Sequence, residues 1–136
     1  MPSKPHAAKS QRVTTARMEL LREESIVSMR ELEESIVRMR NQLKWLETAL
    51  RRSRRLLESG RLAGEMATTA DLAGGRRATS VLMHDIQAAR HRAQRAQFQL
   101  AAAEGSSMAD IARVWGVSRQ LVSRMVKEPM PRRKKA

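Results

Sequence analysis

The sequence predicts an all-α protein in which two long helices lead into a C-terminal helix-turn-helix. Residues 15–59 and 77–104 contain neither glycine nor proline, and their apolar residues recur at heptad spacing. The composition is 41% hydrophobic but only 2% aromatic, which favours long helices over a thick core. The third observation is the stretch 108–127, where the spacing of the apolar residues, of one small residue and of one glycine is that of two short helices packed together.

The first long segment has the pattern of a coiled coil. Residues 1–14 hold two prolines and no periodicity, so we expect a disordered basic tail there and a long helix over 15–59. One apolar row recurs every seven residues and a second row lies between its members. The first row is Met29, Ile36, Leu43, Leu50 and Leu57, and the second is Leu32, Met39 and Leu46. The pattern predicts that chains associate as a dimer, and the flanking residues leave the orientation of the helices open.

The second long segment predicts a helix that folds back on the first. Residues 60–76 hold four glycines without a Walker-type phosphate motif, so we interpret them as a connector. Residues 77–104 form an alanine-rich helix with a heptad series of its own, which suits an antiparallel hairpin. That series is Leu82, Ile86, Ala89, Ala93, Ala96, Leu100 and Ala103. Its basic outer face is interpreted equally well as a solvated face or as a face lying against a DNA backbone.

Charge points to a polyanionic partner. The formal net charge is +13, and residues 105–136 alone hold eight basic and two acidic residues. The tail, residues 129–136, is expected to be disordered and to add non-specific phosphate contacts. Nucleic acid is therefore the first candidate partner.

Residues 105–128 carry the boundary signals of a helix-turn-helix. Gly105 ends the preceding helix, and Ser107 with Asp110 forms an acidic variant of a capping box at the start of the next. Gly116 supplies a left-handed turn, and Ser118 then caps the second helix of the motif. Within the two helices the apolar residues form one inward stripe, with a small residue where the helices come closest. These residues are Ile111, Ala112, Trp115, Val122 and Met125.

The other face of residues 119–127 suits the edges of DNA bases. Arg119, Gln120 and Ser123 are predicted to read bases, because arginine bonds guanine and glutamine bonds adenine bidentately. Arg124 can serve a base or a phosphate, and Lys127 a phosphate. The complete set of predicted DNA-binding residues is Ser106, Ser107, Ser118, Arg119, Gln120, Ser123, Arg124 and Lys127.

The run Ala103-Glu-Gly, Ile111-Ala, Gly116-Val-Ser-Arg and Val122-Ser-Arg124 resembles the DNA-binding module of the resolvase and invertase recombinases. It also resembles the broader homeodomain-like and sigma-factor region 4 helix-turn-helix families. The resemblance covers about a fifth of the chain and implies a module that docks its second helix in the major groove. The recombinase catalytic domain is not recognisable, which argues against recombinase chemistry.

The sequence thus predicts a sequence-specific double-stranded DNA-binding protein, a dimeric transcriptional regulator. Two alternatives remain: a nucleoid-type architectural protein that bridges DNA with little sequence preference, and a coiled-coil adaptor. No catalytic constellation, cofactor motif or small-molecule site is evident, and His84 and His91 beside Asp85 are too few ligands for a metal. Without cysteine, a signal peptide or a membrane-length apolar run, we expect a cytoplasmic, nucleoid-associated protein.

Overall fold

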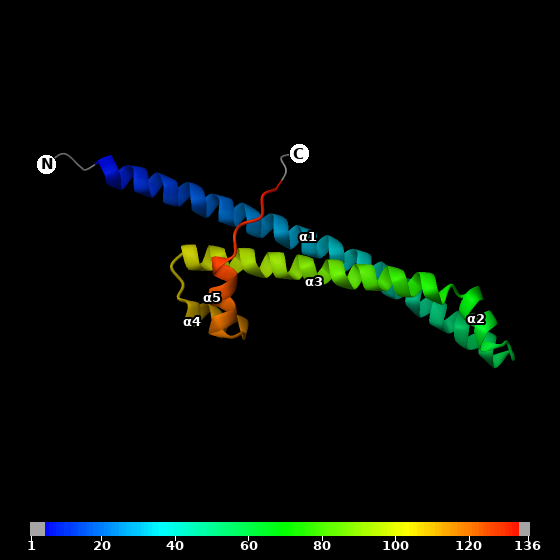
Figure 1. Cartoon of the computed structure of the whole chain (residues 1–136). Coiled ribbons are helices and arrows are strands. Elements are labelled where there is room, and N and C mark those ends of the chain that lie inside the picture. The colour runs from blue at the N-terminus through cyan, green and yellow to red at the C-terminus, as the bar shows by residue number, and fades with distance from the viewer. Residues whose placement is uncertain (1–4, 134–136) are drawn as a thin grey trace. The chain divides into compact units, whose positions relative to one another are not determined.

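The chain folds into five helices, as the computed structural model shows for residues 5–133, with side chains described from residue 15 onward (Figure 1). The helices are α1 (Pro5–Glu58), α2 (Ala63–Thr69), α3 (Leu72–Ala103), α4 (Met108–Trp115) and α5 (Arg119–Lys127). The described residues contain no strand, so the all-α prediction is confirmed. Two compact units divide the chain: unit 1 comprises residues 1–30 and 91–136, and unit 2 comprises residues 31–90. Within the described part, none of the helices is long and apolar enough to cross a membrane.

Helix α1 begins earlier than the sequence predicts. It starts at Pro5, whereas the expected start lay near Thr15 and residues 1–14 were expected to be disordered. Proline suits the first position of a helix because the amide hydrogen it lacks would have no partner there. After Pro5 no glycine or proline interrupts the chain, so the backbone continues directly into the heptad region. Residues 1–4 lie outside the described residues.

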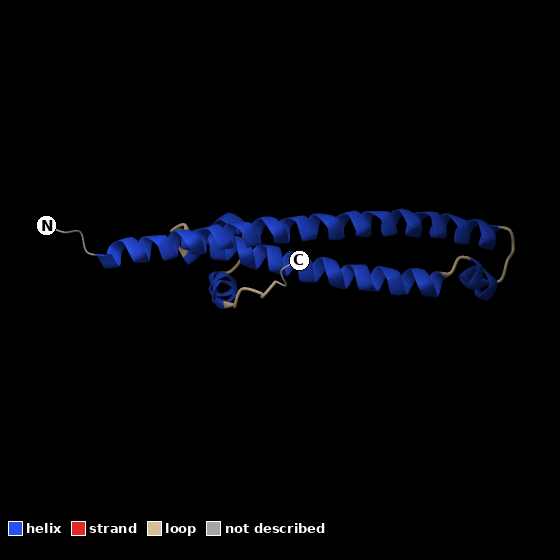
Figure 2. Cartoon of the chain, turned by 90° about the horizontal axis from the view of Figure 1, so that it is seen from above, coloured by secondary structure: helices blue, strands red, loops and turns tan. Residues whose placement is uncertain are grey.

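Unit 2 is an antiparallel helical hairpin, as predicted. Residues 31–58 of α1 run in one direction and residues 72–90 of α3 return beside them, with the short α2 at the turn (Figure 2). Across the hairpin, the Gln42 side-chain amide donates to the carbonyl oxygen of Gly75 at 3.3 Å and to the Thr79 hydroxyl at 3.2 Å. These hydrogen bonds join α1 to the first turns of α3 across the hairpin.

The predicted connector, residues 60–76, is shorter than expected because α3 already begins at Leu72. Asp71 adopts a left-handed backbone (φ 48°), and its carboxylate accepts from the amide of Gly74 at 3.2 Å, as a helix N-cap does. Gly75 lies inside α3 rather than in a loop. A Cβ atom there would come within 2.2 Å of the Trp45 ring, so this glycine allows the indole to pack on the α3 backbone.

The side of α1 that faces α3 is lined largely by small residues. This side consists of the half-buried second row, Leu32, Met39 and Leu46, together with small buried residues. The larger apolar row is not part of it. The small buried residues are Ser35, Ala49 and Ser53, and on α3 Ala89 is fully buried. Small side chains let the two backbones approach closely, which the large ones would prevent.

The larger apolar row therefore stays exposed in the single chain. We call Ile36, Leu43, Leu50 and Leu57 the outer row. Their exposed fractions lie between 47% and 63%, so a full hydrophobic stripe of α1 has no cover in unit 2. Contiguous exposed apolar surface of this kind is typical of interaction sites.

Candidate nucleic-acid interface

The C-terminal part of unit 1 is a three-helix module with its own core. The end of α3 packs with α4 and α5 around five buried residues: Phe98, Ile111, Ala112, Val122 and Met125. Four of these five were expected to be buried from the spacing of the two short helices. Phe98 was missed, although it is the only phenylalanine in the chain and is 0% exposed. The end of α3 is thus the first helix of the module, and not only a helix leading into it.

The predicted boundaries of α4 are confirmed. Gly105 has a φ of +100° just after α3 ends, and the Ser107 hydroxyl accepts from the amide of Asp110 at 3.1 Å. The Ser107 hydroxyl, followed by Arg113, also lowers the pKa of the Asp110 carboxyl. At the other end Gly116 is left-handed (φ 66°, ψ 35°), and its amide donates to the carbonyl of Ala112. That turn sets the direction in which the backbone leaves α4 and enters α5.

Trp115 departs from the predicted inward stripe. Its side chain is 43% exposed, and its ring meets Phe98 edge-on, with centroids 5.4 Å apart and planes at 82°. Edge-to-face geometry is a favoured arrangement of aromatic rings. Trp115 therefore closes the rim of the core and does not fill its centre.

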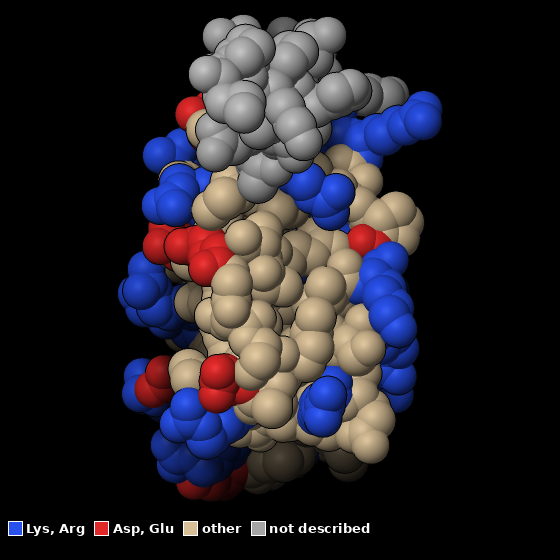
Figure 3. Space-filling view, turned by 90° about the vertical axis from the view of Figure 1, so that its left-hand side faces the viewer, with Lys and Arg blue, Asp and Glu red and all other residues tan. Residues whose placement is uncertain are grey.

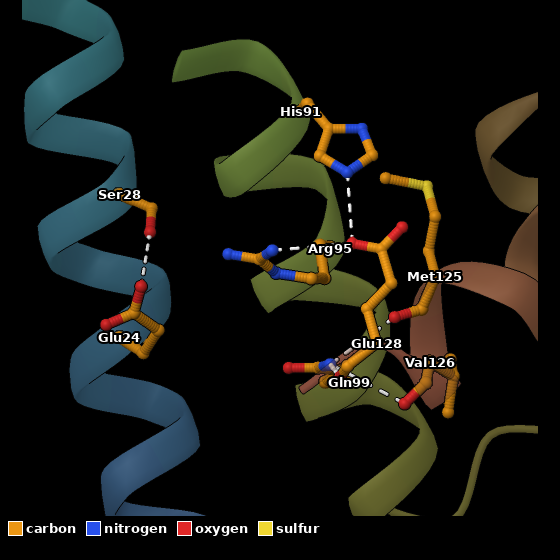
Figure 4. A network of polar contacts seen from close by, with 8 residues as sticks. All are labelled: Glu24, Ser28, His91, Arg95, Gln99, Met125, Val126 and Glu128. Carbon is orange, nitrogen blue, oxygen red and sulfur yellow. Dashed lines mark hydrogen bonds and ion pairs between the residues drawn. The ribbon is translucent and has the colours of Figure 1, made fainter. Parts of the chain in front are cut away.

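Helix α5 begins at its predicted cap, where the Ser118 hydroxyl accepts from the amide of Leu121 at 3.1 Å. Its far end is held by a residue that the sequence did not single out. The buried side-chain amide of Gln99 on α3 donates to the carbonyl oxygens of Glu128 at 2.7 Å and Met125 at 3.3 Å (Figure 4). Gln99 thereby satisfies carbonyl groups that the end of a helix leaves without partners.

Glu128 ties the same end of α5 to α3. Its carboxylate lies 3.0 Å from His91 Nε2 and accepts from Arg95 Nη1 at 3.3 Å (Figure 4). Partial burial acts to raise the pKa of Glu128, but the hydrogen bonds and charges of His91 and then Arg95 outweigh it, so the pKa is lowered. The charged form of Glu128 therefore favours the docked position of α5.

Replacing Glu128 by glutamine is expected to lower the free energy of unfolding of unit 1 by about 1 kcal/mol at pH 7. The reason is that Arg95, whose side chain is only 11% exposed, loses its counter-charge. A lowered folded-state pKa stabilises the fold above the unfolded value of about 4.3, and this stabilisation disappears as pH falls through the folded value. Hydrogen exchange of the α5 amides between pH 7 and pH 3 measures both effects.

The matched control is Glu104→Gln, because Glu104 meets Arg22 at 3.7 Å with both side chains well exposed. That variant should change stability little. Equal losses in the two variants, or a Glu128→Gln loss that persists at pH 3, would contradict the role given to Glu128.

The tail does not behave as a free basic arm over its described part. The Arg133 guanidinium donates to the buried Glu24 carboxylate at 2.5 and 2.8 Å and to the Ser28 hydroxyl at 3.2 Å. Arg133 is thus paired with α1 within unit 1. For this residue, the pairing corrects the prediction that the tail adds non-specific phosphate contacts. Residues 134–136 lie outside the described residues.

The outer face of α5 presents five of the predicted DNA-binding side chains together. Arg119, Gln120, Arg124 and Lys127 are exposed, Ser123 is half-buried, and all five line one shallow hollow. Within the part of the chain that the structure describes, none of the five side chains has a hydrogen bond or ion pair with another residue. They are therefore available to an external partner.

The charge of Arg119 lies where it destabilises α5. Arg119 is the first residue of α5, and the first turn of this helix has no acidic residue. A cation at a helix N-terminus opposes the helix dipole, at a cost of about 0.3–1 kcal/mol. Figure 3 shows one face of the molecule, on which uncharged side chains fill the middle, Lys and Arg lie along the right-hand margin, and basic and acidic side chains are mixed along the left-hand margin.

The three predicted serines are placed differently from one another. Ser107 and Ser118 are exposed but use their hydroxyls as helix caps. Ser106 is exposed, but its amide donates to the carbonyl of Ala101 at 3.0 Å, so this amide is not free to bind a phosphate. The amides without a backbone partner lie instead at the start of α4.

Comparison with known proteins supports the same module. Residues 91–129 match the model of the homeodomain-like domain family, which includes the end of α3 as well as α4 and α5. Searches of curated proteins and of solved structures found no match to the chain. The match begins at His91, where unit 1 resumes along the chain. Residues 91–129 are therefore a homeodomain-like helix-turn-helix domain, a type of domain whose usual partner is double-stranded DNA.

Proposed function

We propose that this chain is a sequence-specific DNA-binding protein that reads the major groove with α5 and acts as a dimeric transcriptional regulator. One observation carries the proposal: five polar or basic side chains share the outer face of α5 and form no hydrogen bond or ion pair within the described residues. They project from a helix held at both ends, by the Ser118 cap and by Gln99. A rigid support of this kind limits the entropy lost when the side chains meet DNA.

The chemistry of this face fits base readout. Arg119 offers a planar fork that bonds O6 and N7 of guanine, and Gln120 offers a donor and an acceptor for adenine. Both lie in the first turn of α5, the part of a recognition helix that reaches deepest into the groove. Ser123 follows one turn later, and Arg124 and Lys127 extend the face toward the phosphates.

A dimer is supported by the exposed outer row of α1. A single recognition helix contacts few base pairs, so two linked copies are the usual way to reach useful affinity and specificity. The outer row provides an apolar face that a second copy could cover. We propose that the protein works in this form on nucleoid DNA in the cytoplasm.

Lys127→Ala tests the orientation of α5 on DNA. Lys127 is assigned to a phosphate, so its loss should weaken binding to every duplex sequence alike and reduce the salt dependence, d log K/d log[salt], by about one unit. Fluorescence anisotropy with duplex DNA over a range of salt concentrations measures both quantities.

The matched control is Lys44→Ala, which removes the same charge from an exposed position of α1 in unit 2. It should leave binding almost unchanged. If both variants weaken binding equally, DNA is bound by overall charge and not by the α5 face. If wild type shows no binding at ~50 mM salt, where phosphate contacts are strongest, the DNA-binding proposal fails.

A further inference from the structure

Charged residues of alternating sign follow the outer row of α1. Glu33, Arg40, Glu47 and Arg54 each lie three residues before a member of that row, so they occupy the adjacent stripe on the same side of the helix. All four are exposed. Their signs alternate along α1 as negative, positive, negative, positive. We call them the flanking charges.

From this arrangement we infer that two copies of the chain associate through the outer rows of α1 in antiparallel orientation, with a two-fold axis beside Leu43. The inference rests on the proposed dimer and specifies its interface. Around that axis Leu43 meets Leu43 of the second copy, and Ile36 meets Leu50 of the second copy. Three of the four outer-row residues are thus matched with one another, and Leu57 lies opposite Met29 of the second copy, which is also apolar and exposed.

The flanking charges select this orientation. A two-fold axis perpendicular to both helices brings the same flank of each helix to the same edge of the interface. Glu33 then lies opposite Arg54 of the second copy, and Arg40 lies opposite Glu47 of the second copy. All four charges of each chain acquire a partner of opposite sign.

A parallel pair would not use the flanking charges. Its two-fold axis runs along the helices, so the flanking charges of the two chains fall on opposite edges. Each would then meet the half-buried row of the partner, which consists of Leu32, Met39 and Leu46. Ion pairs between the flanking charges could not form, and apolar packing alone would hold the chains together.

The same charges also specify the register. A shift of the antiparallel pair by one heptad would place Arg40 opposite Arg54 and Glu47 opposite Glu47, and the opposite shift would be equally repulsive. Like charges facing each other disfavour the wrong alignments, as in natural coiled coils. Glu47 pairs with Arg51 along its own helix, and a carboxylate has room to accept a second arginine.

Engineered disulfides test the orientation, because the chain has no cysteine of its own. Full-length Ile36→Cys and Leu50→Cys proteins are purified separately, mixed, allowed to exchange and oxidised, and non-reducing electrophoresis with mass spectrometry identifies the linked residues. We expect the mixture to give a 36-to-50 link and each protein alone to give none. In the antiparallel pair the two copies of position 36 are about 14 residues, or ~21 Å, apart along the helix axis, and so are the two copies of position 50. Both separations are far beyond the ~7 Å limit for a disulfide.

Two controls keep the result interpretable. Asn41→Cys, exposed on another side of α1, should not link to Leu50→Cys. Light scattering of the unmodified chain should give twice the mass of one 15.4 kDa chain. In addition, Arg40→Glu should raise the dimer dissociation constant about tenfold, and adding Glu47→Arg in the same chain should restore it, because the pair is then reversed and not lost.

The outcomes separate this inference from the proposed function. Links within Ile36→Cys alone would establish a parallel dimer, which overturns the inference and leaves the dimeric regulator intact. A dimer without any of these links would have another interface or another register of the outer rows, and either result would also overturn it. A monomeric mass would remove the dimer altogether, while DNA binding by α5 would still be judged by the Lys127→Ala comparison.

Discussion

Phe98→Ala is expected to lower the free energy of unfolding of unit 1 by about 3–5 kcal/mol, the largest effect of any single substitution considered. Phe98 is fully buried at the centre of the core that joins α3, α4 and α5, and its ring also packs edge-on with Trp115. Removing it leaves a cavity that short helices cannot close. Hydrogen exchange of the α4 and α5 amides is the suitable measurement, because it reports the local stability of the part of unit 1 that Phe98 supports.

The same variant should lose DNA binding under conditions where wild type binds, since α5 is no longer held. Val114→Ala is the matched control, because Val114 lies on α4 but is 74% exposed. It should alter protection of the α5 amides very little. If Phe98→Ala left that protection within about 1 kcal/mol of wild type, the core described for the module would be wrong.

Arg119→Ala is expected to reduce affinity for the preferred DNA sequence by about 1–3 kcal/mol and to relax the preference at one base pair. Arg119 is exposed in the first turn of α5, and its position opposes the helix dipole. Helix stability should therefore not fall when the charge is removed. Binding to the preferred duplex and to duplexes with single substitutions gives both the affinity and the preference.

Arg119→Lys separates charge from geometry. Lysine keeps the charge but lacks the planar fork that bonds guanine at two atoms, so part of the preference should still be lost. Equal preference in wild type and Arg119→Ala would remove Arg119 from base readout. A loss that is uniform over all sequences would reassign it to a phosphate.

The boundaries of the helix-turn-helix could be predicted because they depend on local chemistry. Ser107, Gly116 and Ser118 act on amides or backbone angles within a few residues of themselves, and the structure places all three as expected. Phe98 and Gln99 could not be assigned in the same way. Their partners lie on α4 and α5, so their roles depend on contacts between residues far apart in the sequence.

In the hairpin, the sequence likewise did not show which face of α1 packs against α3. Heptad spacing predicted two apolar rows on α1, but spacing alone does not say which neighbouring helix each row meets. In the structure α3 packs on small residues such as Ser35 and Ala49, and the row containing Leu43 remains outside. Likewise Gly75 looked like part of a linker, because the approach of Trp45 to its backbone is a tertiary contact.

Selection from random duplex DNA at ~150 mM salt measures whether α5 reads a DNA sequence. Base contacts persist at this salt concentration, whereas binding by charge alone weakens. Sequencing after several rounds should reveal a motif with two related half-sites, and Arg119→Ala should lose one of its positions. Bound DNA that stays random after those rounds would contradict the claim and favour a protein that coats DNA without reading it.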